Sequence, residues 1–180
     1  MTTTGLVILT GASGSGKTTI AERIEQQHPE QARVFRFDSI GVPSQEERIA
    51  KWGAGSEPGG GWQRAMTIEW LDRIARERDA VPVLFEGQMR LAFITEGLAA
   101  VGIAEARIVL VHCDDAARTH RLCNERNQPD LATPDMMNWA RFLQGEAEAG
   151  GFELLDTSKI SIEESVEYVC RCLGIGRSGG

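Results

Sequence analysis

Eight residues near the start of this 180-residue chain, 11–18, limit what it can fold into more than any other stretch. They read Gly-Ala-Ser-Gly-Ser-Gly-Lys-Thr and match G-x-x-x-x-G-K-[ST], the pattern of a phosphate-binding loop, or P-loop. An apolar run over 6–9 precedes the motif, and residues 19–24, with apolar side chains at helical spacing, follow it. Because strand, loop, Lys-Thr pair and helix fall in register, a ligand-free turn of the same composition is the weaker interpretation.

The motif predicts a site for the phosphates of a nucleotide. Glycines let successive backbone N–H groups point at phosphate oxygens, and the helix that follows adds free N–H donors and the positive end of its dipole. We expect Lys17 to reach the β- and γ-phosphates and Thr18 to hold Mg²⁺ through its hydroxyl. The predicted nucleotide-binding residues of this segment are Gly11, Ser13, Gly14, Ser15, Gly16, Lys17, Thr18 and Thr19.

The composition indicates a single globular domain over 1–180. The chain is 42% hydrophobic and long enough for a full core, and no repeat or linker marks a second domain. The formal net charge of −7 argues against a nucleic-acid partner, because such binding rests on Lys and Arg. No apolar run approaches the ~20 residues of a membrane span, and no signal peptide is evident. The four cysteines lack zinc-site spacing and are expected to be reduced, which predicts a cytoplasmic protein without a membrane partner.

Apolar runs alternate with helical patterns along the chain. This alternation predicts an α/β fold, in which a five-stranded, mainly parallel sheet lies between two layers of helices, as in the three-layer fold of P-loop NTPases. His28 precedes the proline that ends the first helix, and we expect it on the surface. The expected strands are 5–10, 33–37, 81–85, 107–113 and 152–156, and the expected helices include 17–27, 63–78, 91–102, 134–149 and 162–173.

Two acidic residues follow predicted strands, and ligands of such sheets bind beyond the C-terminal ends of the strands. Asp38 follows the second strand, either as a catalytic group or as a cap of the next turn. Glu86 ends the third strand in the Walker B arrangement, which holds or orients Mg²⁺, although a glutamate at a strand end is also common on protein surfaces. Gln88 and Arg90, just beyond, would face the cleft and contact the substrate.

Arginines gather over 118–134, a segment that we expect to form a lid. Arg118 and Arg121 are three residues apart and share a helix face, and Arg126 lies at or just past the end of that helix. They form either a solvated basic face or a clamp on the phosphates; we assign the clamp to Arg121 and Arg126 and leave Arg118 open. Ser158, at the end of the last strand, completes the predicted nucleotide site.

Residues 43–62 carry no clear periodicity, and 52–62 are the most glycine-dense part of the chain. The plain interpretation of 52–62 is a mobile surface loop. The alternative is a flap that covers the substrate, with Trp52 and Trp62 at its hinges.

The P-loop, the aspartate after the next strand and the arginine-rich lid together resemble the small P-loop kinases, which include nucleoside monophosphate, shikimate and gluconate kinases. The local match is best with chloramphenicol phosphotransferase, whose second strand resembles residues 37–39 and whose last segment resembles 156–163. That resemblance implies that Asp38 accepts the proton of a substrate hydroxyl.

The sequence also departs from several members of that group. A shikimate kinase would show two aspartates spaced D-x-D where residues 36–38 supply only Asp38, and its triple glycine would follow the third strand rather than precede it. No arginine clearly matches the acceptor-binding one of nucleoside monophosphate kinases. The chain has no N-K-x-D motif for guanine, which argues against a GTPase.

The sequence therefore predicts an ATP- and Mg²⁺-dependent phosphotransferase that acts on a hydroxyl of a small molecule, with Lys17, Asp38 and Arg126 as the catalytic residues. Two alternatives stay open: a nucleoside monophosphate kinase, whose phosphate acceptor needs no general base, and a non-catalytic ATP-binding regulatory module. No motif specifies the acceptor or the oligomeric state.

Overall fold

The computed structural model describes residues 5–55 and 57–176 of the chain. Five strands form one sheet in the order β2-β3-β1-β4-β5, and every neighbouring pair is parallel. This arrangement confirms the predicted α/β class and the predicted parallel sheet. The strands are β1 Leu6–Thr10, β2 Arg33–Arg36, β3 Val83–Gly87, β4 Arg107–His112 and β5 Glu153–Asp156.

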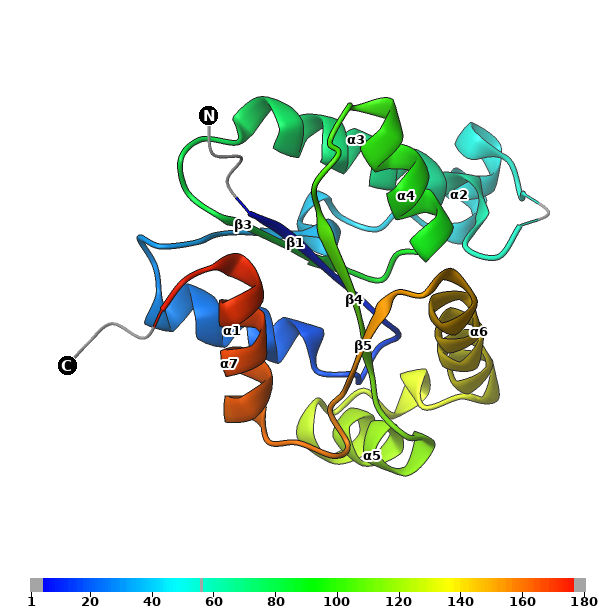
Figure 1. Ribbon diagram of the computed structural model, residues 1–180. Helices are drawn as coiled ribbons and strands as arrows, with labels where there is room; N and C mark the ends of the chain where they lie inside the picture. Colours follow the sequence, from blue (N-terminus) through cyan, green and yellow to red (C-terminus); the bar gives the residue numbers. More distant parts are fainter. Residues whose placement is uncertain (1–4, 56, 177–180) are drawn as a thin grey trace.

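Helices cover both faces of the sheet and make it the middle of three layers (Figure 1). Helices α1 and α7 pack on one face, and α3, α4 and α6 pack on the other. The helices are α1 Lys17–Gln27, α2 Gln45–Trp52, α3 Gly60–Glu77, α4 Leu91–Ala100, α5 Asp115–His120, α6 Pro134–Gly150 and α7 Ile162–Leu173.

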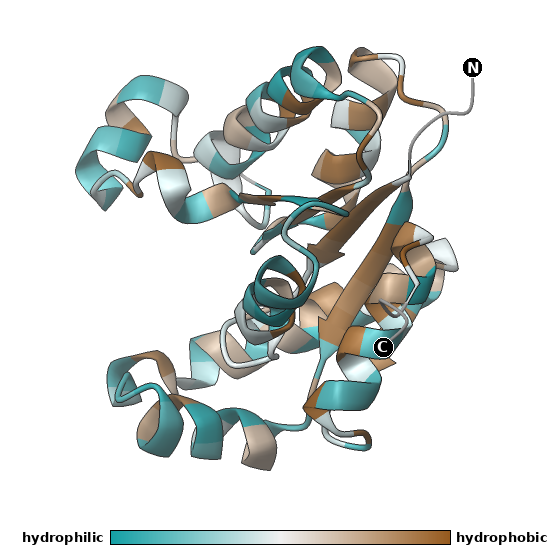
Figure 2. Cartoon of the chain, turned by 90° about the vertical axis from the view of Figure 1, so that its left-hand side faces the viewer, coloured by the Kyte–Doolittle hydropathy of each residue, from teal (hydrophilic) through white to brown (hydrophobic). Residues whose placement is uncertain are grey.

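The alternation of side chains along β1 builds two cores from one strand. Val7 and Leu9 point into the cluster shared with α1 and α7, whereas Leu6 and Ile8 point into the cluster shared with α3 and α4. Figure 2 shows the result: apolar strands at the centre and helices that turn hydrophilic residues outward. The P-loop directly follows β1, whose two faces are both buried. The position of the P-loop is therefore fixed by both cores.

The segment 43–62 is more regular than the sequence analysis expected. Helix α2 begins at a capping box, in which the Ser44 hydroxyl accepts from the Glu47 N–H and the Glu47 carboxylate accepts from the Ser44 N–H. Helix α3 already begins at Gly60. The glycine-rich connection is therefore shorter than predicted and runs from 53 to 59, with Ser56 outside the described residues.

The expected surface position of His28 is wrong. His28 follows α1, and only 8% of its surface is exposed. Helix α7 packs alongside α1, and the chain after α7 brings Ile175 to the same groove. The physical reason is thus a helix–helix contact that the periodicity of α1 alone does not reveal.

No helix within the described residues is long and apolar enough to cross a lipid bilayer.

Candidate active site

The P-loop leaves β1 and turns into α1 at the C-terminal edge of the sheet. Gly11 has φ +151°, and a Cβ there would lie 2.2 Å from the carbonyl oxygen of Val111 on β4. Gly16, the N-cap of α1, has φ +105°. Side chains at these two positions would clash with β4 or strain the backbone, so glycine is required for the loop to take this path.

The loop presents donors that the described chain leaves unused. The backbone N–H groups of Lys17, Thr18 and Thr19, in the first turn of α1, make no hydrogen bond to a described backbone carbonyl. The Ser15 hydroxyl is buried and likewise has no partner among the described residues. Unpaired donors around the start of a helix form a site for an anion such as a phosphate.

Lys17 is the buried cation of this loop. Its side chain is 7% exposed, and Nζ donates to the carbonyl oxygen of Ala12 at 3.2 Å. Burial lowers the pKa of Lys17 to about 8; the charge of Glu86 opposes this shift, and the charges of Arg118 and Arg126 add to it. Asp38 also acts on this ammonium group. Charged residues from four segments of the chain therefore all influence the pKa of Lys17.

Glu86 lies inside β3, one residue before the strand's end, and is 6% exposed. Burial raises the pKa of its carboxyl group, and Lys17 partly opposes that shift. No hydrogen bond or ion pair within the described chain satisfies this carboxylate. A buried, unsatisfied carboxylate beside a phosphate-binding loop fits a Mg²⁺ site, because Mg²⁺ takes one or two carboxylates, phosphate oxygens and waters.

Asp38 lies in a short 3₁₀ turn, Phe37–Ile40, directly after β2. Its side chain is exposed, and its carboxylate accepts no hydrogen bond from any described residue. The carboxylate therefore does not cap the turn that follows β2. Its charge acts on both Lys17 and Glu86, so it lies on the phosphate side of the sheet edge.

Arg121 and Arg126 both line a small cavity with Lys17 and Thr18. A π-helical turn, Arg121–Glu125, separates the two arginines, and the N–H of Arg126 donates to the carbonyl of Arg121. In an α-helix, side chains that are five residues apart point in different directions. The π turn is wider, and it brings the side chains of Arg121 and Arg126 to one side. Arg121 also donates to the hydroxyl and carbonyl oxygens of Thr157, at 2.8 and 2.9 Å.

Like Arg121, three further predicted contact residues are engaged in contacts within the protein. Gln88 accepts from the N–H and the hydroxyl of Ser13, at 3.1 and 3.2 Å. Ser158 donates to the carboxylate of Asp156. These residues thus brace the site, and their contact with a ligand stays a prediction.

Arg90 is the third of them. It pairs with Glu146 at 2.7 Å and with Glu57 at 3.1 Å, and its guanidinium lies over the rings of Phe93 and Phe142. Through these pairs it connects the end of β3 to α6 and to the glycine-rich connection.

Thr157 is a site residue that the sequence analysis did not single out. It is 8% exposed, and its hydroxyl donates to the carbonyl of Ser15 at 2.7 Å. It therefore joins β5, the P-loop and Arg121. The one signal for it was its place at the C-terminal end of a predicted strand, next to Ser158.

A cavity of about 300 Å³ lies between α2 and the start of α3. Arg48 lines it with its guanidinium 5.4 Å from the centre of the Trp62 ring, and the Nε of Arg48 has no hydrogen-bond partner among the described residues. Trp62 in turn meets the edge of Phe37, the residue before Asp38. Packed aromatic rings thus lie between this cavity and the turn that carries Asp38.

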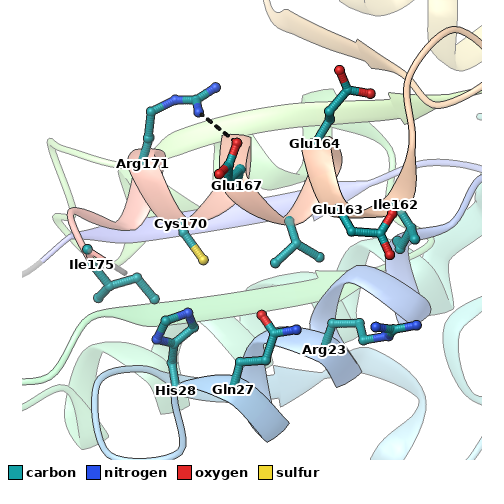
Figure 3. Close-up of a pocket in the computed structure, with 12 residues that line it drawn as sticks. Arg23, Gln27, His28, Ile162, Glu163, Glu164, Glu167, Cys170, Arg171 and Ile175 are labelled. Atoms are coloured by element: carbon teal, nitrogen blue, oxygen red, sulfur yellow. Dashed lines mark ion pairs between the residues drawn. The ribbon is translucent and has the colours of Figure 1, made fainter. Parts of the chain in front are cut away.

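A second groove, of about 630 Å³, lies elsewhere, between α1 and α7 (Figure 3). Arg171 and the three carboxylates of α7 line one side of it, Arg23 of α1 lines the other, and His28 and Ile175 lie at one end. None of the predicted site residues lines it.

Solved structures share this architecture. A gluconokinase from Sinorhizobium meliloti is 16% identical, with a TM-score of 0.63 over 95% of this chain and 92% of its own. A tunicamycin resistance protein from Deinococcus radiodurans is 19% identical, with a TM-score of 0.64 over 98% and 99%. A shikimate kinase from Acinetobacter baumannii, solved with shikimate, is 18% identical, with a TM-score of 0.57 over 94% and 92%.

The chain has the fold of the small P-loop kinases. The resemblance predicted from the P-loop, the aspartate and the lid is confirmed at the level of the fold. No protein-family model matches the sequence, and no curated protein matches it. At these identities the likeness describes the architecture, and the chemistry has to be argued from the site.

Proposed function

We propose that this protein is an ATP- and Mg²⁺-dependent kinase that transfers the γ-phosphate to a hydroxyl group of a small molecule. The observation that carries the proposal is one cluster of charges: Lys17, Glu86, Asp38 and Arg126 act on one another beside the unpaired amides of the P-loop. A regulatory ATP-binding module would need the amides and Lys17, but it has no use for Asp38 or for an arginine that closes on the phosphates.

Each residue would have a distinct task. The amides of the P-loop bind the β- and γ-phosphates, and Lys17 and Arg126 stabilise the negative charge of the phosphoryl group as it transfers. Thr18 and Glu86 would hold Mg²⁺, which when bound would offset part of the negative charge of the phosphates. Most of the rate acceleration would come from positioning and electrostatics.

Asp38 would act on the acceptor. Its carboxylate accepts the proton of the acceptor hydroxyl while that oxygen forms a bond to the γ-phosphorus and the bond to the β,γ-bridging oxygen breaks, so that ADP leaves. The cavity between α2 and α3 is the proposed position of the rest of the acceptor, because Trp62 in its wall packs on Phe37, the residue before Asp38.

A cytoplasmic location of the protein stays a prediction.

The test is acceptor-dependent ADP release. The protein is assayed with Mg·ATP and a panel of nucleosides, nucleotides, shikimate, sugar acids, aminoglycosides and chloramphenicol-like alcohols. We expect one alcohol to raise the rate at least about tenfold over water, and Lys17→Ala to remove that rate by several orders of magnitude. Arg76→Met, an exposed change on α3, is the control that keeps full activity. A Lys17→Ala variant with full activity would overturn the proposal.

A further inference from the structure

Arg118 is the largest of the fully buried side chains, with 0% of its surface exposed. It projects from α5 into the space between the end of β4 and the P-loop. Its Nη1 donates to the carbonyl oxygen of Ser13 at 2.6 Å, and its Nη2 donates to that of Cys113 at 3.2 Å. The guanidinium therefore contacts the P-loop directly from the inside of the protein.

The charge of this guanidinium is opposed only from a distance, by the carboxylates of Asp114 and Asp115. No carboxylate of the described residues forms an ion pair with Arg118, and its buried Nε has no hydrogen-bond partner there. The two acids at the start of α5 have other partners: Asp114 accepts from the Ala117 N–H at 2.7 Å, and Asp115 pairs with Arg141. Arginine stays protonated even when burial lowers its pKa, so a full positive charge remains inside the protein.

The charge lies close against the loop. A Cβ at Gly14 would be 3.1 Å from the Cγ of Arg118, so the backbone at Gly14 packs on this side chain without a side chain of its own between them. The field of Arg118 also reaches Lys17: after burial and the opposing effect of Glu86, it is the strongest further influence on the pKa of Lys17. Arg118 thus acts on the anion site without touching it.

We propose that Arg118 is a positioning residue of the phosphate site, whose buried charge acts through the P-loop backbone to favour binding of a polyphosphate. In the free protein an unpaired buried charge is unfavourable, and the negative phosphates on the far side of the loop relieve that cost. This inference rests on the proposed nucleotide binding by the P-loop. The inference assigns Arg118 a role in nucleotide binding. That role depends on the electric field of its charge and not on a contact with the phosphates.

Two matched variants separate charge from hydrogen bonding. Arg118→Lys keeps the charge and loses the two-pronged contact, whereas Arg118→Gln loses the charge and keeps an N–H donor. Dissociation constants for AMP, ADP and ATP, with Mg²⁺, are measured by calorimetry for both variants, for the wild type and for the exposed control Arg76→Met. Melting temperatures of the nucleotide-free proteins show whether each variant is folded.

We expect Arg118→Gln to weaken ATP binding about tenfold, because one charge near several phosphate charges acts strongly at low dielectric. The loss should shrink for ADP and be smallest for AMP, and Arg118→Lys should stay within about threefold of the wild type for all three. If Arg118→Gln and Arg118→Lys lost the same amount of ATP affinity, or if a variant lost as much AMP affinity as ATP affinity, Arg118 would only brace the loop. Either result would overturn the inference. Failure of the wild type to bind ATP would instead overturn the proposed function.

Discussion

At the scale of single residues, Lys17 is the group whose environment matters most. The motif identified Lys17, but the depth of its burial and the neighbours that act on it depend on β3, β2 and the lid, which the motif does not contain. Its pKa of about 8 means that it carries its charge at neutral pH and loses it within the range accessible to experiment.

The pH dependence of ATP binding follows from this pKa. Bound phosphates favour the protonated form of Lys17. Above pH 8, where the free protein has lost that proton, binding of ATP has to take one up, so the affinity for ATP falls as the pH rises. Between pH 7.5 and 9.5 we expect the dissociation constant for Mg·ATP to rise on the order of 20-fold. Lys17→Arg, which stays charged, should show no such rise in calorimetric titrations. A pH-independent wild type would contradict the buried, titrating Lys17.

Asp38 is the residue that separates an alcohol acceptor from a phosphate acceptor. Asp38→Asn keeps the shape and removes the proton acceptor, so with an alcohol acceptor kcat should fall about 10²–10⁴-fold while the KM for ATP stays the same. A nucleoside monophosphate kinase would keep its turnover in this variant. Steady-state kinetics with the acceptor from the panel distinguish these outcomes.

At the scale of elements, the strands and most helices were predictable from the sequence, whereas α2 and the π turn of the lid were not. All five strands were predicted. Continuous apolar runs indicated the buried strands β1, β3 and β4, whereas the alternating pattern of residues 33–37 indicated β2. Helix α2 was missed because none of its residues is buried, so its periodicity carries little information. Its capping box, Ser44 with Glu47, was the signal that could have shown it.

The π turn of the lid was beyond prediction for a different reason. The sequence places Arg121 and Arg126 five apart, which an α-helix would send to different sides. Leu122 lies within this turn and is fully buried, so the turn packs against the rest of the protein, and the spacing of the arginines alone does not reveal that packing. The shared face of Arg121 and Arg126 is therefore visible only in the structure.

Gly11 gives a test of the junction between β1 and the P-loop. Gly11→Ala would place a Cβ 2.2 Å from the carbonyl of Val111, so β1 or β4 must shift. We expect a loss of roughly 3 kcal/mol or more in the free energy of unfolding, measured by urea denaturation.

Gly145→Ala is the matched control for that variant. Gly145 lies on the exposed side of α6, and a methyl group there would meet nothing within 4 Å, so this change should stabilise the protein by about 0.5–1 kcal/mol. Equal effects of the two substitutions would show that the close approach at Gly11 is not what requires glycine there.

At the scale of the whole molecule, the sheet lies between two cores, and the site lies at the edge where β1, β2, β3 and β5 all end. In a chain of net charge −7, this edge gathers four cations beside the carboxylates of Glu86 and Asp38. The cations are Lys17, Arg118, Arg121 and Arg126. The acceptor could not be predicted from sequence because its proposed cavity combines α2, the glycine-rich connection and α3, which carry no shared motif.

Ligand binding at this edge should stabilise the whole molecule. Mg·ATP at 100 times its dissociation constant should add about 2.7 kcal/mol, which raises the melting temperature of a chain this size by several degrees. Lys17→Ala should lose most of that shift in a thermal melt, while Arg76→Met should keep it. A shift of equal size in Lys17→Ala would show that ATP binds somewhere other than the P-loop.

The most direct test of the central claim is to follow the γ-phosphate itself by ³¹P NMR, with Mg·ATP and the acceptor that raises ADP release. Transfer to an alcohol predicts loss of the γ-signal and growth of a phosphomonoester signal, absent without acceptor and absent in Lys17→Ala. A new anhydride signal would identify a nucleoside monophosphate kinase. Inorganic phosphate as the sole product, with or without acceptors, would contradict the assignment of this protein as a small-molecule kinase.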